Sequence, residues 1–136
     1  MAMFIVEENA PSPKEFLSLR KSAGMGARSL EGAKKGLGNE LYAVKLLEYS
    51  TKKIVGMGRV VGDGGTVYHI CDMVIHPEWQ RHGGGTIIMN LIMKYISNQN
   101  TPDAYVNLMA DIEGFYEKWD FVKSSPTSEG MYLKSK

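Results

Sequence analysis

The sequence has 136 residues, 43% of them hydrophobic and 23% charged, which is ordinary for a globular protein. A chain of this length can bury roughly 70% of its unfolded surface, so we expect a single domain over residues 1–136. The formal net charge of +1 argues against a nucleic-acid partner. No apolar stretch is long enough for a membrane span or a signal peptide, and the single cysteine, Cys71, fits a reducing compartment. We therefore expect a cytoplasmic protein without a membrane partner.

The first third of the chain predicts one strand followed by two helices. The strand covers residues 4–8. Ser12 can cap a helix that has Pro13 at its first position and that ends near residue 24. Ser29 begins a second, short helix, which the glycines at 36 and 38 end.

Three strands are predicted next. Residues 41–47 and 53–61 form an antiparallel pair, and glycines in the second strand indicate a bulge or close backbone packing. A glycine-rich turn at 62–65 leads into a strand at 66–75.

A glycine-rich loop and a helix follow this strand directly. The helix is expected from Gly84 to about Asn98. Glycines let the backbone approach a ligand, and the first turn of a helix offers free N–H groups at the positive end of its dipole. The loop therefore predicts a site for a phosphate or pyrophosphate group. Its candidate ligand-binding residues are Gln80, Arg81, His82, Gly83, Gly84, Gly85 and Thr86.

Two common phosphate sites are excluded by what this loop lacks. A P-loop requires a lysine before the hydroxyl residue, whereas Thr86 follows Gly85 directly. A dinucleotide fold requires an early Gly-x-Gly-x-x-Gly loop and an acidic residue about twenty positions later, and Asp103-Ala104-Tyr105 is a poor match for that residue.

The last third predicts a strand at 104–109, a short helix at 112–119, and a hairpin of 120–123 with 130–133. The complete order is β-α-α-β-β-β-α-β-α-β-β. This is an α/β (α+β) fold in a single domain. Three histidines (His69, His76 and His82) lie near Cys71 in sequence, but strand alternation and Pro77 scatter them, so no metal site is expected.

Two blocks of this sequence resemble the GCN5-related N-acetyltransferase (GNAT) superfamily. Val74-Ile75-His76-Pro77 followed by Gln80-Arg81-His82-Gly83-Gly84-Gly85 resembles its acyl-CoA signature. Gly114-Phe115-Tyr116-Glu117-Lys118-Trp119-Asp120-Phe121 resembles its Tyr-Glu-Lys-x-Gly-Phe segment, with Asp120 in place of glycine. That position often has left-handed backbone geometry, which aspartate tolerates.

The resemblance implies a mixed, mostly antiparallel sheet whose central strands splay apart, flanked by helices. It implies acetyl-CoA as cosubstrate, with the pantetheine arm on the backbone of Met73, Val74 and Ile75 and the pyrophosphate on the loop from His82 to Thr86. A side chain at Gly83 or Gly85 would occupy the space of the phosphates.

The implied reaction is direct transfer of an acetyl group to an amine, which must lose a proton before it attacks. Tyr116 stands at the family's general-acid position. His69 and Asp72 are the candidate bases, and Asp72 is alternatively an anchor for a cationic amine. Strand alternation places these two on opposite faces unless a bulge intervenes. A covalent route through Cys71 is disfavoured, because a buried cysteine mostly behaves as a small apolar residue.

The identity of the acceptor is left open by the sequence. The acidic residues Asp63, Asp72, Asp111 and Glu113 favour a small primary amine over an anion. The alternatives are a protein or peptide acceptor, aminoacyl-tRNA, and a sensor that binds acyl-CoA without transferring it. Members of the resembled family commonly dimerise, so a homodimer is compatible with the resemblance.

Overall fold

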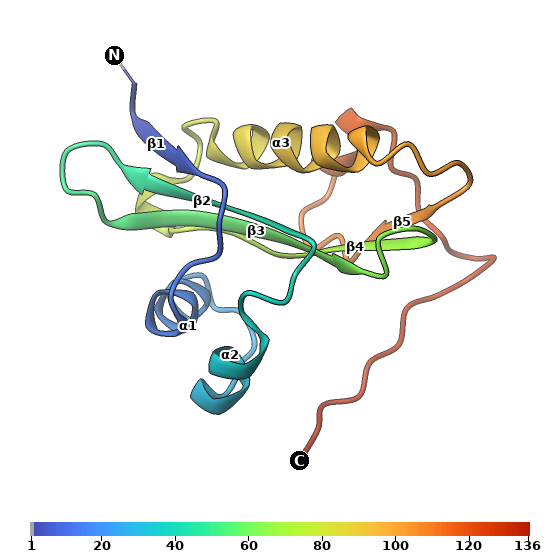
Figure 1. Cartoon of the computed structure of the whole chain (residues 1–136), viewed down its shortest axis with the longest axis horizontal. Coiled ribbons are helices and arrows are strands. Elements are labelled where there is room, and N and C mark those ends of the chain that lie inside the picture. The colour runs from blue at the N-terminus through green and yellow to red at the C-terminus, as the bar shows by residue number, and fades with distance from the viewer. Residues whose placement is uncertain (1) are drawn as a thin grey trace.

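The computed structural model describes residues 2–136 and contains one five-stranded sheet of order β1-β2-β3-β4-β5 (Figure 1). All neighbouring strands are antiparallel except β4 and β5, which are parallel. In chain order the elements are β1 (Phe4–Glu7), α1 (Pro13–Ser22), α2 (Leu30–Gly36), β2 (Tyr42–Glu48), β3 (Ile54–Gly62), β4 (Val67–Ile75), the 3₁₀ turn η1 (Pro77–Trp79), α3 (Gly84–Asn98), β5 (Tyr105–Leu108) and the 3₁₀ turn η2 (Tyr116–Trp119).

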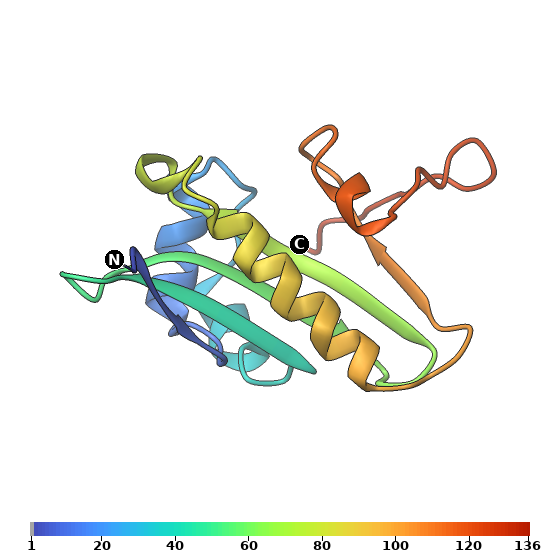
Figure 2. The same ribbon diagram turned by 90° about the horizontal axis from the view of Figure 1, so that it is seen from above.

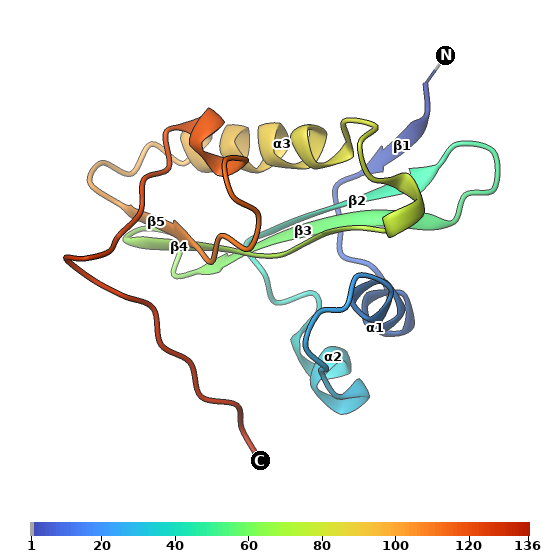
Figure 3. The same ribbon diagram turned by 180° about the vertical axis from the view of Figure 1, so that it is seen from behind.

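Helices cover both faces of the sheet. Helix α3 lies on one face, and α1 and α2 lie on the other (Figures 1 and 3). The apolar stripe of α3, with Ile88, Met89 and Ile92 fully buried, packs on β2, β3 and β4. Phe16 and Leu19 of α1 form a second, smaller core on the opposite face. None of the helices in residues 2–136 is long and apolar enough to cross a membrane.

The helix starts follow from the predicted caps. The Ser12 side chain accepts a hydrogen bond from the Glu15 N–H, and the Glu15 side chain accepts one from the Ser12 N–H, which completes a capping box. Ser29 caps α2 by accepting from the Gly32 N–H. Helix α3 runs over the predicted residues, from Gly84 to Asn98.

Strand β4 contains a bulge and then loses its partner on one side. Met57 pairs with Val74 and Arg59 with Cys71, so two residues, Asp72 and Met73, stand opposite Gly58. The pairing of β4 with β5 ends at Ile70 and Leu108, and β4 continues to Ile75 without β5 beside it. The two strands thus part in the middle of the molecule (Figure 2), as the predicted splayed sheet requires.

The predicted hairpin after the last helix is wrong. Residues 109–136 contain no strand, and the predicted helix at 112–119 is reduced to the 3₁₀ turn η2. Val122, Met131, Tyr132 and Leu133 are 88–95% exposed, and the chain runs away from the sheet as an extended segment (Figure 1). A two-stranded hairpin without a buried face is marginal in water, so the apolar pattern of 120–123 and 130–133 does not suffice to form these strands.

Candidate active site

The N-terminus of α3 has no side-chain cap, although its first residue, Gly84, is buried. The cap residue Gly83 makes no side-chain hydrogen bond to the helix, and the first turn contains no acidic residue. Arg81 and His82, which precede it, are exposed. The positive end of a fifteen-residue helix is therefore available to an anion.

Two glycines of the loop have different physical roles. Gly83 has φ +82°, and a Cβ built on it would have no atom within 4 Å, so a side chain there would point into open space beside the helix end. A Cβ on Gly85 would lie 3.2 Å from the ring of Phe115. Substitution at Gly85 thus disturbs protein packing directly, whereas substitution at Gly83 tests the space where a ligand would lie.

The open edge of β4 offers backbone groups beside this helix end. The His76 N–H donates to Val55 O of β3, 2.7 Å away, and backbone groups alternate in direction along a strand. Those of Met73 and Ile75 consequently face the gap left by β5, while those of Val74 face β3. The Gln80 side chain donates to the carbonyl of Ile75 (3.1 Å), so Gln80 fastens the loop to the end of β4.

His69 lies where β4 and β5 part, paired in register with Asn107. Its Nδ1 is 2.7 Å from Asn107 Oδ1. An amide oxygen only accepts, so Nδ1 carries the proton and Nε2 of the neutral ring is left as an acceptor. This is the arrangement that a general base requires.

Asp72, the second candidate base, is engaged by two arginines. Its Oδ1 accepts from Arg20 Nη1 at 2.6 Å and its Oδ2 from Arg59 Nη1 at 2.9 Å. The bulge brings Asp72 to the face of α1, which is also the face of His69, because Arg59 and His69 both lie beside Cys71 on that side. With both oxygens bonded to buried cations, Asp72 is poorly suited to accept a proton or to bind an amine.

Tyr116 lies on the opposite face of the sheet from His69. Its ring packs in the core beneath α3, in contact with Phe115 and Phe121, and only 7% of the residue is exposed. Burial, with a smaller effect from Asp111, raises the pKa of the phenol above its ordinary value. The hydroxyl accordingly stays protonated near neutral pH and can donate a proton. Asp120, which ends η2, has φ +69°, as expected for the residue that replaces glycine.

Cys71 lies on the same face as His69 but is a poor nucleophile. Burial, followed by the charge of Asp72, raises the pKa of its thiol to about 12. Only the thiolate attacks a thioester, so this environment disfavours a covalent acetyl-cysteine.

Asp63, another acidic residue that favoured an amine acceptor, is engaged within the turn between β3 and β4. Asp63 accepts backbone hydrogen bonds from Gly65, Thr66 and Val67. Asp72 is likewise engaged, by Arg20 and Arg59. Two of the four carboxylates that favoured an amine acceptor over an anion are therefore bonded within the protein. In the part of the chain that is described, no group of three or more His, Cys, Asp or Glu residues could hold a metal ion.

Sequence reasoning missed the contacts of three residues in this region. Asn107 bonds to His69, and Arg20 and Arg59 both bond to Asp72. Asn107 meets His69 across a parallel pairing, and Arg20 meets Asp72 from 52 positions away. No local spacing could have linked these residues. The glycine-rich β3 and the polar Asp72 inside a strand were the available signals of a bulge.

Comparison with known proteins identifies the same fold and the same class of enzyme. The family model for an acetyltransferase (GNAT) domain matches residues 29–134. An uncharacterized N-acetyltransferase of Porphyra purpurea is 28% identical over 120 residues, which are 87% of this chain and 69% of the relative. A crystal structure of a protein of unknown function from meticillin-resistant Staphylococcus aureus, described as a probable acetyltransferase, is 40% identical, with a TM-score of 0.93 over 98% of this chain and 100% of that one. Glucosamine-6-phosphate N-acetyltransferase of Arabidopsis thaliana shares the fold at 18% identity, with a TM-score of 0.71 over 98% of this chain and 100% of that one.

Proposed function

The chain belongs to the GNAT acetyltransferase family, and from that premise we propose that it transfers an acetyl group from acetyl-CoA directly to a primary amine of a small molecule. One observation carries the proposal. The open N-terminus of α3 lies next to a strand edge that has lost its neighbour, so a phosphate site and a row of free backbone groups adjoin each other. These are the two features that a pyrophosphate followed by an amide-bearing arm requires.

The residues that would hold acetyl-CoA follow from this geometry. The N–H groups of Gly83, Gly84, Gly85 and Thr86 would bind the pyrophosphate. The backbone of Met73 and the N–H of Ile75 would pair with the pantetheine arm as with a neighbouring strand. Gln80 would keep the loop in place through its hydrogen bond to the Ile75 carbonyl. The exposed side chains of Arg81 and His82 would add a positive and a polar group beside the pyrophosphate.

The chemistry is shared between the two faces of the sheet. His69 Nε2 takes a proton from the acceptor ammonium, and the free amine attacks the thioester carbonyl. The new C–N bond forms as the C–S bond breaks, and the departing thiolate takes the phenol proton of Tyr116, whose raised pKa keeps it protonated. The amide nitrogen then loses its second proton to solvent, and the Tyr116 phenolate regains one from solvent. The fixed tautomer of His69, set by Asn107, supports this assignment.

A small acceptor is supported by the way the α1–α2 connection is held. Arg20, only 5% exposed, donates from Nη2 to the carbonyl of Gly26 at 2.6 Å, which ties this connection to the helix and strand beneath it. A connection held in this manner leaves the acceptor side compact, which suits a metabolite better than an extended peptide.

The test is acetyl-CoA binding and thiol release with a panel of primary amines, using Gly83→Asn as the diagnostic variant. Asparagine tolerates the left-handed backbone of Gly83, so the side chain fills the ligand space without much backbone strain. We expect the affinity for acetyl-CoA to fall by roughly a hundredfold or more. A fall of this size corresponds to the loss of about two charge-assisted hydrogen bonds. The matched control is Gly64→Asn, which has φ +80° and lies in the β3–β4 turn; it should bind like the parent.

Three results would contradict the proposal. Equal binding by Gly83→Asn and the parent would mean that the phosphates lie elsewhere. Binding without thiol release for any amine would favour a sensor of acyl-CoA. Release only with peptides or with aminoacyl-tRNA would replace the small-molecule acceptor by a macromolecule.

A further inference from the structure

Four charged side chains form a buried network beneath the bulge of β4. Arg20, Arg59, Asp72 and Glu40 alternate in charge, and their side chains are only 6–13% exposed. Besides its bond to Asp72, Arg59 donates from Nε to Glu40 Oε1 at 2.9 Å. Buried ions of this kind must be paired, because each would otherwise lie uncompensated in a poorly polar surrounding.

The network connects α1 and α2 to one point of the sheet. Arg20 bonds the α1–α2 connection at the Gly26 carbonyl, and Glu40 accepts from the N–H of Gly38 just after α2. Both guanidinium groups also lie near the Phe16 ring, with centroid distances of 5.7 and 5.8 Å. The two arginines of the network meet at Asp72.

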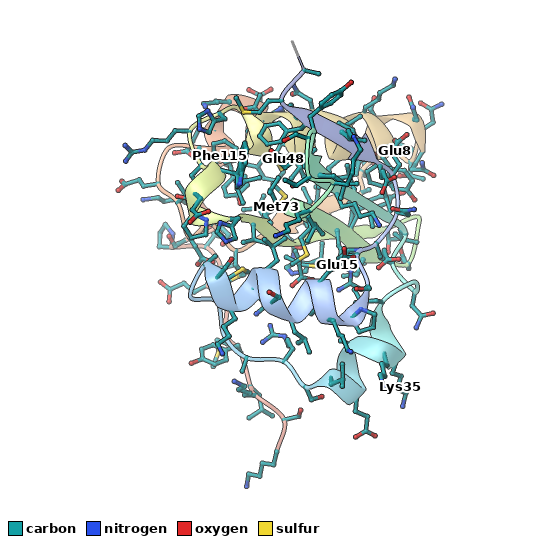
Figure 4. The ribbon with its side chains drawn as sticks, turned by 90° about the vertical axis from the view of Figure 1, so that its left-hand side faces the viewer. Glu8, Glu15, Lys35, Glu48, Met73 and Phe115 are labelled. Carbon is teal, nitrogen blue, oxygen red and sulfur yellow. The ribbon has the colours of Figure 1, made fainter. Side chains whose placement is uncertain are left out.

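Asp72 occupies a backbone conformation that needs support. Its φ is +55°, which is uncommon for a residue other than glycine. It is the first residue of the bulge, and Met73, the second, lies over Gly58, where an added Cβ would come within 2.7 Å of the Met73 sulfur. Met73, labelled in Figure 4, packs against the core beneath α3, on the other face of the sheet from α1. The bulge is therefore held from below by the two arginines and from the other side by close packing on Gly58.

We propose that Asp72 is a positioning residue: anchored by Arg20 and Arg59, it fixes the β4 bulge and so aims the backbone of Met73 and Ile75 at the ligand. The bulge begins two residues after the last pair of β4 with β5, at the point where β4 starts to face the gap. Release of the Asp72 carboxylate would let this stretch return toward a regular register. The backbone groups that face the gap would then turn away from it. This inference rests on the proposed function for the identity of the ligand, but not for the geometry of the bulge.

The variant that tests it is Asp72→Asn, and the matched control is Glu40→Gln. Asparagine keeps the size and the tolerance for positive φ, but its amide NH₂ cannot accept from one of the two arginines. Glu40→Gln removes one charge of the same network at the end away from β4. Two measurements are needed. The first is the acetyl-CoA affinity by calorimetry, at a temperature well below the unfolding midpoint. The second is hydrogen exchange of the β4 amides, which needs no ligand.

We expect Asp72→Asn to weaken acetyl-CoA binding roughly tenfold, which corresponds to the loss of about one backbone hydrogen bond. It should also speed exchange at Val74 and His76, whose N–H groups face β3, but not at residues 68–70. Glu40→Gln should change neither readout more than about twofold. Unchanged affinity and exchange in Asp72→Asn, or equal losses in both variants, would overturn the inference. If Asp72→Asn does not fold, Arg20→Lys replaces it, because lysine keeps the charge but cannot bond Asp72 and Gly26 together.

Failure of the proposed function gives a different result. A parent protein that binds no acetyl-CoA would refute that function, while faster exchange at Val74 and His76 in Asp72→Asn would still support the role of Asp72 in the bulge.

Discussion

The stretch from β4 to α3 and the stretch after β5 are both rich in large apolar residues, yet their side chains have opposite environments. Tyr68, Ile88, Met89 and Ile92 are fully buried between sheet and helix. Met131, Tyr132 and Leu133 are 94–95% exposed. The first stretch contains the glycine loop and the open strand edge. The second contributes one buried residue, Tyr116, to the core, with Phe115, Trp119 and Phe121 packed against it.

This difference indicates how the site is built. The groups that would bind acetyl-CoA are backbone groups, and backbone geometry is held by packing on both faces of β4. The residues after Phe121, in contrast, are exposed. Stability and ligand binding should therefore respond to changes in the first stretch and be indifferent to changes after Phe121.

The largest expected effect is on stability. Ile88→Ala should lower the free energy of unfolding by about 2–5 kcal/mol, because it leaves a cavity in the core beneath α3. Leu133→Ala should stay within about 0.5 kcal/mol of the parent, since the side chain contacts little. Urea unfolding measures both. A large loss in Leu133→Ala would show that the exposed segment packs against something in solution.

Cys71 reactivity should differ from that of an exposed thiol by a factor on the order of a thousand at pH 8. The thiol has its pKa raised to about 12, so below that pH it is overwhelmingly protonated and unreactive. A second cysteine introduced as Ser135→Cys lies in the exposed segment and should react with a disulfide reagent at an ordinary rate. Rapid labelling of Cys71 in the folded parent would contradict the half-buried, protonated thiol.

Tyr116→Phe should reduce turnover roughly a hundredfold and leave acetyl-CoA affinity unchanged, because only the proton donor is lost. The ring keeps its packing in the core. Tyr132→Phe, the same change in the exposed segment, should leave turnover as it is. Thiol release and calorimetry distinguish the two effects. Unchanged turnover in Tyr116→Phe would remove the general-acid assignment.

Asn107→Ala should lower turnover by roughly tenfold or less, since it removes one hydrogen bond that fixes the tautomer of His69. The loss should appear in kcat more than in the KM for acetyl-CoA. Asn98→Ala, an exposed change at the end of α3, is the control. A Michaelis constant that rises while kcat is constant would assign Asn107 to ligand binding instead.

The elements of the first stretch could be predicted because local signals and burial agree there. The apolar run of β4, the glycines of the loop and the periodicity of α3 gave helix bounds that match the structure. The hairpin at 120–123 and 130–133 had similar local signals but failed, because a strand also needs an edge to pair with and a face to bury.

The backbone geometry of the candidate site could be predicted from the sequence, and its side-chain contacts less well. The glycine loop and the part of β4 that faces the gap lie in one continuous segment, so their relation could be read along the chain. The anchoring of Asp72 by Arg20 and Arg59, and the pairing of His69 with Asn107, depend on the bulge and on a parallel strand pair. Such contacts are set by tertiary structure and leave no regular spacing in the sequence.

The most direct test of the central claim is thermal unfolding of the parent protein with acetyl-CoA, free CoA, ATP or NAD. A ligand at a hundred times its dissociation constant stabilises the folded state by about 2.7 kcal/mol, which for a domain of this size raises the unfolding midpoint by roughly 10 °C. We predict this rise with acetyl-CoA and CoA and no comparable rise with ATP or NAD. No rise with either CoA species, or a rise with ATP or NAD in their place, would contradict the assignment of the glycine loop and of the acetyl donor with it.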